Sequence, residues 1–170
     1  MVNTLSHYKI LTDKTERFLA SLGSLSVEEL SKRPTSDRWS LLMVAEHLML
    51  AEILTLSQLD KLQQDAASVN QERKPKDVVL YYVVLAVLKF GIRVKVPSKA
   101  MMPVGDISLE KLRERWLEHQ RKTENIINQL PPEKHVMPVF LHKVVGPMNL
   151  VHAIRLGNIH FDSHMKKIVV

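Results

Sequence analysis

The chain has 170 residues, a length typical of one domain with a hydrophobic core of its own. Hydrophobic residues make up 45% and charged residues 25%, which argues against a disordered chain. The absence of cysteine excludes disulfides and a thiolate nucleophile or metal ligand from the chain itself. The formal net charge is +6, but the basic residues are scattered and lack interleaved aromatic residues, so we expect no nucleic-acid partner.

Few glycines, prolines and aromatic residues favour helices over sheets. The N-terminal residues show no signal peptide, and the most apolar run, residues 78–88, is shorter than the roughly 20 residues that cross a bilayer. We therefore expect a cytoplasmic protein with one domain over residues 1–170, a small-molecule substrate and no membrane partner.

The first half of the chain predicts two long helices. The first runs from about Thr4 to Leu22 and is followed by a turn in which Ser26 and Glu29 form a capping box. The second begins near Trp39 and continues to about Ala66. Residues 74–107 form a long connection, whose first part is compatible with a short buried helix and whose part after Gly91 is irregular. A connection of this length is expected to have a function or to cover part of the molecule.

The second half predicts two more long helices. One opens at the cap-like Ser108 and ends at Leu130, before two prolines that cannot continue it. Its apolar positions step by three and four, which is typical of a helix in a bundle, and His119 falls in the same register. The last runs from Asn149, a good N-cap, to about Ile168. Together these segments predict an all-α four-helix bundle with a long crossover between its second and third helices.

Two histidines of the last helix form a candidate half of a metal site. His160 and His164 are four residues apart, so they lie roughly 40° from each other and beside the apolar face of that helix. His152 lies roughly 100° from the middle of the pair, too far around the helix to share the same metal. Taken alone, the pair has an ordinary interpretation as two helix residues.

His47 is the candidate third ligand. It lies on the second helix in an apolar stripe with Met43, Leu50, Ala51 and Leu54, where an imidazole needs a polar partner or a metal. A hydrogen-bonded core histidine is the ordinary interpretation of this residue alone. On two helices of one bundle, the three histidines together favour a metal site with open positions for water or substrate.

Two better-known metal sites do not fit. A zincin helix needs a glutamate directly after its first histidine, where this chain has Phe161, and none of the eight histidines has the glutamate three residues earlier that di-iron bundles use. No general base can be assigned. Glu46 lies about 100° from His47 and is better explained as an orienting or ion-paired residue. His119 is either an ordinary half-buried seam residue or part of the pocket.

The stretch W39-S40…E46-H47-L48, followed by H142-KVVG-P-MNL and I159-HFDSHMKKI, resembles the DinB/YfiT-like superfamily. The resemblance spans nearly the whole chain, although Lys143 stands where the family often has proline after the histidine, and His152 where an acidic residue is common. It implies a four-helix bundle that binds a divalent metal through His47, His160 and His164. Zinc or nickel is expected first, with iron or manganese as alternatives.

The resemblance implies a transferase that uses a low-molecular-weight thiol, similar to the bacillithiol transferases. One alternative is a hydrolase that uses metal-bound hydroxide. Another is a non-catalytic stress-response or binding bundle with a vestigial metal site. Family members often pair through their bundles, so a homodimer is also expected.

Overall fold

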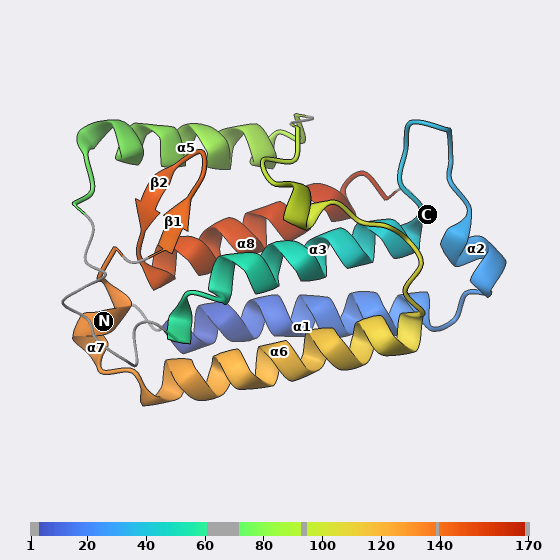
Figure 1. Cartoon of the computed structure of the whole chain (residues 1–170), viewed down its shortest axis with the longest axis horizontal. Helices are drawn as coiled ribbons and strands as arrows, with labels where there is room; N and C mark the ends of the chain where they lie inside the picture. Colours follow the sequence, from blue (N-terminus) through green and yellow to red (C-terminus); the bar gives the residue numbers. More distant parts are fainter. Residues whose placement is uncertain (1–3, 61–71, 93–94, 139, 169–170) are drawn as a thin grey trace.

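The computed structural model describes residues 4–60, 72–92, 95–138 and 140–168. Within these residues, the long helices of the bundle lie side by side along one direction (Figure 1). They are α1 (Thr4–Leu22), α3 (Leu41–Leu56), α6 (Leu109–Gln129) and α8 (Leu150–Met165). The predicted all-α fold is confirmed, and a small antiparallel hairpin is its only departure among the described residues.

The remaining elements are short or lie outside the bundle. The hairpin pairs Phe140 with Met148 and His142 with Gly146, and it was not predicted from the sequence. Gly146 opens its second strand with a φ of +71°, a conformation that favours glycine. These elements are α2 (Val27–Ser31), α5 (Pro75–Lys89), η1 (Lys99–Met101), α7 (Pro132–His135), β1 (Phe140–His142) and β2 (Gly146–Met148).

Side-chain caps fix where the helices begin. The Ser26–Glu29 capping box is present as predicted, and Ser108 caps α6 by accepting the backbone N–H of Lys111. Asn149 caps α8 by accepting the N–H of His152 at 2.8 Å. Ser40 caps α3 by accepting the backbone N–H of Met43. The caps at Ser40 and Asn149 define where α3 and α8 begin, and these two helices carry the three candidate histidines.

A buried carboxylate joins three helices of the core. Glu52 of α3 accepts hydrogen bonds from the Tyr8 hydroxyl of α1 at 2.9 Å and from Trp116 Nε1 of α6 at 2.7 Å. The amide of Gln120 donates to the same carboxylate and to Thr15. Burial raises the pKa of the Glu52 carboxyl above its usual range. The Glu52 carboxylate thus meets donors from α1 and α6, whereas the carbonyl oxygen of Gln120 is buried without a partner among the described residues.

Two helix ends differ from prediction. The second bundle helix ends at Leu56, not near Ala66, because the chain turns at Ser57 and Gln58. There the Gln58 side chain accepts the backbone N–H of Leu141 in the hairpin. Residues 61–66 of the predicted helix lie outside the described residues. The last helix ends at Met165, three residues before the predicted end.

The helix predicted in the crossover is present as α5, but the expectation that it is buried is wrong. Tyr81, Leu85 and Leu88 are buried, and α5 packs chiefly on α8. Val79 and Val83 are 62% and 50% exposed. Among the described residues between Gly91 and α6, the one helix is the short η1, which lies next to α3 (Figure 1). In the described part of the chain, no helix has the length and apolar character needed to cross a membrane.

Candidate metal centre

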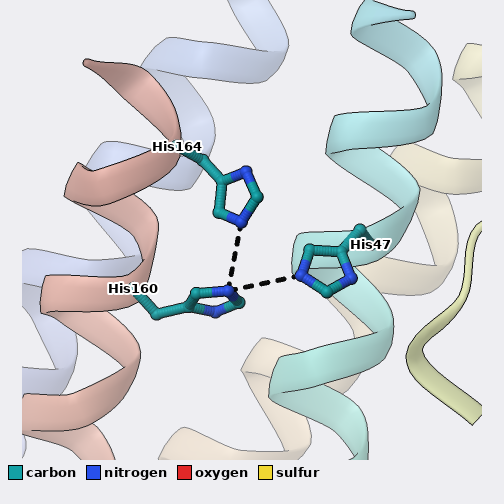
Figure 2. Close-up of side chains that lie close together, drawn as sticks. All are labelled: His47, His160 and His164. Carbon is teal, nitrogen blue, oxygen red and sulfur yellow. Dashed lines mark hydrogen bonds between the residues drawn. The ribbon is translucent and has the colours of Figure 1, made fainter. Parts of the chain in front are cut away.

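Three histidine rings converge between α3 and α8 (Figure 2). His160 Nε2 lies 3.3 Å from His47 Nε2 and 3.2 Å from His164 Nε2. The three ligand nitrogens lie within 4.8 Å of one another. His47 is 3% exposed, and the other two are partly buried. The structure thus brings together the three residues that the sequence singled out.

The positions of the protons argue against a simple hydrogen-bonded cluster. His47 Nδ1 donates to the Met101 carbonyl at 2.8 Å, so in the neutral ring its Nε2 carries a lone pair. His160 Nε2 then has to donate in order to bond His47. A nitrogen that donates in this way cannot also accept a bond from His164. One of the two short contacts is therefore unsatisfied while all three rings stay neutral.

Protonation is a costly way to satisfy that contact, because the cluster is buried. Burial lowers the pKa of His47 and, together with the neighbouring histidines, lowers the pKa of His160 well below its usual value. Burial and the charge of His47 bring the pKa of His164 to about 3. Near neutral pH the three rings are therefore neutral, the state in which imidazole binds metals.

A divalent metal fits this donor set. With metal–nitrogen bonds of about 2.0–2.1 Å and tetrahedral angles, two imidazole nitrogens on one zinc lie about 3.3–3.4 Å apart. Two of the three nitrogen pairs, both with His160 Nε2, are 3.3 Å and 3.2 Å apart, and all three nitrogens lie within 4.8 Å of one another. A metal would accept all three lone pairs at once, which a proton cannot do.

The backbone of the crossover orients His47. Its hydrogen bond to Met101 fixes both the tautomer and the direction of Nε2. The neighbouring Glu46 accepts the backbone N–H groups of Val104 and Gly105 at 3.0 and 2.7 Å. Glu46 therefore fastens the crossover to α3 and does not face the cluster as a base, in line with its expected orienting role.

Trp39 covers the cluster from one side. Its ring stacks parallel to that of His164, with centroids 6.3 Å apart, and is tilted against His47 at 4.8 Å. From the sequence we expected this residue only to begin a helix and to belong to the family pattern. Neither it nor the Met101 carbonyl could be assigned to the centre from spacing, since both reach it from outside the regular helices.

The cluster opens into a cavity of about 1120 Å³ between α3, α5 and α8. His142 of the hairpin also lines this cavity. Its Nδ1 accepts the backbone N–H groups of Val144 and Val145, so the neutral ring carries its proton on Nε2. Burial lowers the pKa of His142, which keeps that ring neutral. The only hint of this position in the sequence was its place in the family pattern.

Two other histidines lie outside the cluster. His152 contacts Arg73, with 2.9 Å between its Nδ1 and the guanidinium, and packs against Tyr81, so its exclusion from the ligand set agrees with the structure. His119 lies 3.4 Å from the Thr123 hydroxyl and does not line the cavity. The ordinary interpretation of His119 as a seam residue therefore holds.

Comparison with known proteins identifies a family for this arrangement. The sequence model of the DinB superfamily matches residues 10–168, which include all three clustered histidines. Searches of curated proteins and of solved structures each gave no significant match.

Proposed function

The chain belongs to the DinB superfamily, and on that premise we propose that it is a divalent-metal-dependent enzyme that transfers a low-molecular-weight thiol to an electrophilic substrate. The observation that carries the proposal is the convergence of three neutral imidazole nitrogens on one point beside a cavity. Imidazole suits zinc, nickel and iron, and we expect zinc or nickel first.

A metal bound by three imidazoles keeps positions open and lowers the pKa of a thiol or water that binds there, which supplies a nucleophile near neutral pH. A thiol is the easier of the two to ionise, because its unperturbed pKa is about 8.5 and that of water about 15.7. The chain has no cysteine, so this thiol has to arrive as a substrate.

The surroundings of the cluster also favour a thiol over water. Glu29, Asp37 and Glu52 are the carboxylates that line the cavity in the described part of the chain. Each already accepts a hydrogen bond: Glu29 from Ser26, Asp37 from Thr35, and Glu52 from Tyr8, Trp116 and Gln120. No carboxylate of the described residues joins the three histidines in their cluster, so none is placed there as a general base for water. For that reason we rank a hydrolase second.

Residues around the cluster have separate roles in this proposal. Trp39 keeps water from one side of His47 and His164. The Met101 carbonyl holds His47 in the tautomer that leaves Nε2 free for the metal. His142 is available as a neutral donor to an anionic group in the cavity, because its Nδ1 is already occupied by backbone N–H groups.

Metal content is the first test. We expect one zinc or nickel ion per chain in protein purified without chelator, and a loss of that metal in His160→Gln. His152→Gln is the matched control on the same helix and should keep the metal, since His152 is not in the cluster. Wild-type protein with far less than one metal per chain, or His160→Gln with full metal content, would contradict the site.

Turnover is the second test. Zinc-loaded protein is assayed with bacillithiol, cysteine or glutathione and the electrophile 1-chloro-2,4-dinitrobenzene, and in parallel with the ester p-nitrophenyl acetate. The proposal predicts thiol-dependent product that His160→Gln loses and His152→Gln retains. Ester cleavage without thiol transfer indicates the hydrolase, whereas full metal content without either activity indicates a binding bundle.

A further inference from the structure

The cavity beside the histidines has two chemically different ends. From His47 to Leu56 the wall on α3 extends about 14 Å beyond the cluster, at about 1.5 Å per helical residue. This arm is lined mainly by apolar side chains from three helices, with Glu52 and Thr55 of α3 as polar exceptions. The apolar ones are Leu48, Ala51 and Leu56 of α3, Val84, Val87 and Leu88 of α5, and Ala153, Ile154 and Leu156 of α8.

The end that holds the histidines carries positive charge. Lys32, Arg38, Lys95 and Lys167 line the cavity and are exposed. Lys167 is close enough to lower the pKa of both His160 and His164 by its charge. Arg38 precedes Trp39, which stacks on the cluster, so this cation also lies at the histidine end.

These four cations outnumber the two carboxylates, Glu29 and Asp37, that line the cavity outside its apolar arm. Lys32, Arg38 and Lys95 make no ion pair with any described residue. An apolar arm that ends at an excess of cations and a metal-binding cluster is complementary to a molecule with an acidic head and an apolar tail.

We propose that the cavity binds an anionic amphiphile, with its acidic group at the basic end beside the histidines and its apolar chain along α3, α5 and α8. The proposal rests on the proposed function in one respect, because it takes the anionic amphiphile to be the electrophilic substrate that receives the thiol. The thiol needs only the open metal position, whereas a cavity of about 1120 Å³ has room for a larger second substrate.

Binding is tested without turnover, by calorimetry on the full chain. The probes are decanoate, the neutral decanol, the cationic decyltrimethylammonium and the short anion acetate, all below micelle-forming concentrations. We expect decanoate to bind at least about tenfold more tightly than each of the other three, a difference of about 1.4 kcal/mol. Equal affinity for the three ten-carbon probes would show that the cations do not contribute to binding. Equal affinity for decanoate and acetate would show that the apolar arm does not contribute.

Variants locate the binding site. Lys95→Glu with Lys167→Glu reverses two charges at the basic end and should weaken decanoate binding at least tenfold, or by about 1.4 kcal/mol. Lys111→Glu with Arg113→Glu, at exposed positions on α6 outside the cavity, is the charge-matched control and should bind as the wild type does. Ala51→Leu fills part of the arm and should shorten the longest fatty acid that binds. Unchanged binding in both cavity variants contradicts the proposal.

The exposed outer face of α5 is the competing place for an apolar chain. Val79→Ser with Val83→Ser removes apolar surface there without touching the cavity lining. Decanoate binding should persist in this variant, and its loss would overturn the cavity assignment.

The metal-free His160→Gln protein separates this proposal from the proposed function. If decanoate still binds to His160→Gln, the cavity proposal stands whatever the metal assays give. If the wild-type protein has full metal content and does not bind decanoate, the cavity proposal is wrong and the proposed function is unaffected.

Discussion

At the scale of single residues, the centre depends on where one proton lies. His47 can offer Nε2 to a metal because its Nδ1–H is held by the Met101 carbonyl at 2.8 Å. Trp39 adds an apolar wall against His47 and His164. Removing water from one side of the nitrogens strengthens every electrostatic interaction inside the site. The Met101 carbonyl thus sets the tautomer of His47, and the Trp39 indole keeps water from one side of the three-histidine cluster.

The position of Trp39 gives a direct optical prediction. The chain has two tryptophans, and Trp116 lies in the core with its Nε1 bonded to Glu52. Nickel added to metal-free protein should quench the emission of Trp39, whose ring centroid is 4.8 Å from that of His47. In a fluorescence titration, Trp39→Phe should lose most of the quenching and Trp116→Phe should keep it. Equal quenching in the two variants would place the nickel elsewhere.

His119 provides a pH prediction that does not involve the metal ligands. Burial lowers its pKa from 6.5 to about 4 in the folded protein. As the pH falls below 6.5 the unfolded chain takes up this proton first, so stabilisation that is complete above pH 6.5 is lost as the pH approaches 4. Because the ring is only half-buried, we expect a loss of about 1–3 kcal/mol.

Urea unfolding at pH 7.5 and pH 4.5, with chelator present, measures this effect. His119→Gln should lose less stability between the two pH values than the wild type does. His7→Gln, at an exposed position of α1, is the control and should follow the wild type. Identical pH dependence in wild type and His119→Gln would show that the ring does not titrate as described.

At the scale of elements, the crossover is held on α3 by two adjacent residues. Glu46 accepts the N–H groups of Val104 and Gly105, while His47 donates to Met101 a few residues earlier. Gly105 has a φ of +81°, and a Cβ there would lie 2.8 Å from the Met43 side chain. The crossover therefore has little freedom where it passes α3, and its position determines the direction of the His47 ring.

Removing the Glu46 carboxylate should affect both stability and metal binding. Glu46→Ala leaves two backbone N–H groups without their acceptor, which we expect to cost about 1–3 kcal/mol in urea unfolding. Metal affinity, measured by competition with a chelating dye, should fall as well, because the Met101 carbonyl is no longer held against His47. Glu114→Ala, at an exposed position of α6, is the control. Unchanged metal affinity in Glu46→Ala would mean that His47 does not depend on the crossover.

The elements also show what a sequence can and cannot predict. The caps at Ser26, Ser108 and Asn149 were predictable because each depends on chemistry within three residues. The register of His160 and His164 was predictable for the same local reason. The end of α3 at Leu56, by contrast, lies beside a contact between Gln58 and the hairpin, whose residues are 83 apart in the sequence. The exposure of α5 was missed because a helix that is apolar all round usually lies in a core.

At the scale of the whole molecule, the histidine cluster joins the two halves of the chain. His47 lies 113 residues before His160, and the crossover and α6 lie between them in sequence. Unfolding separates α3 from α8 and therefore destroys the site. Any ion that binds the folded site and not the unfolded chain stabilises the fold by mass action. Metal occupancy and global stability should be linked.

This linkage can be measured as a shift in melting temperature. At a free zinc concentration of about one hundred times Kd, the added stability is about 2.7 kcal/mol, and a chain of this size gains about 2–4 °C per kcal/mol. We therefore expect zinc to raise the melting temperature of metal-free wild-type protein by about 5–10 °C, and chelator to reverse the change. His152→Gln should respond as the wild type does, and His160→Gln should not respond. If His160→Gln gains as much as the wild type, the ion stabilises the protein through some other group, and the bridge between α3 and α8 is not its site.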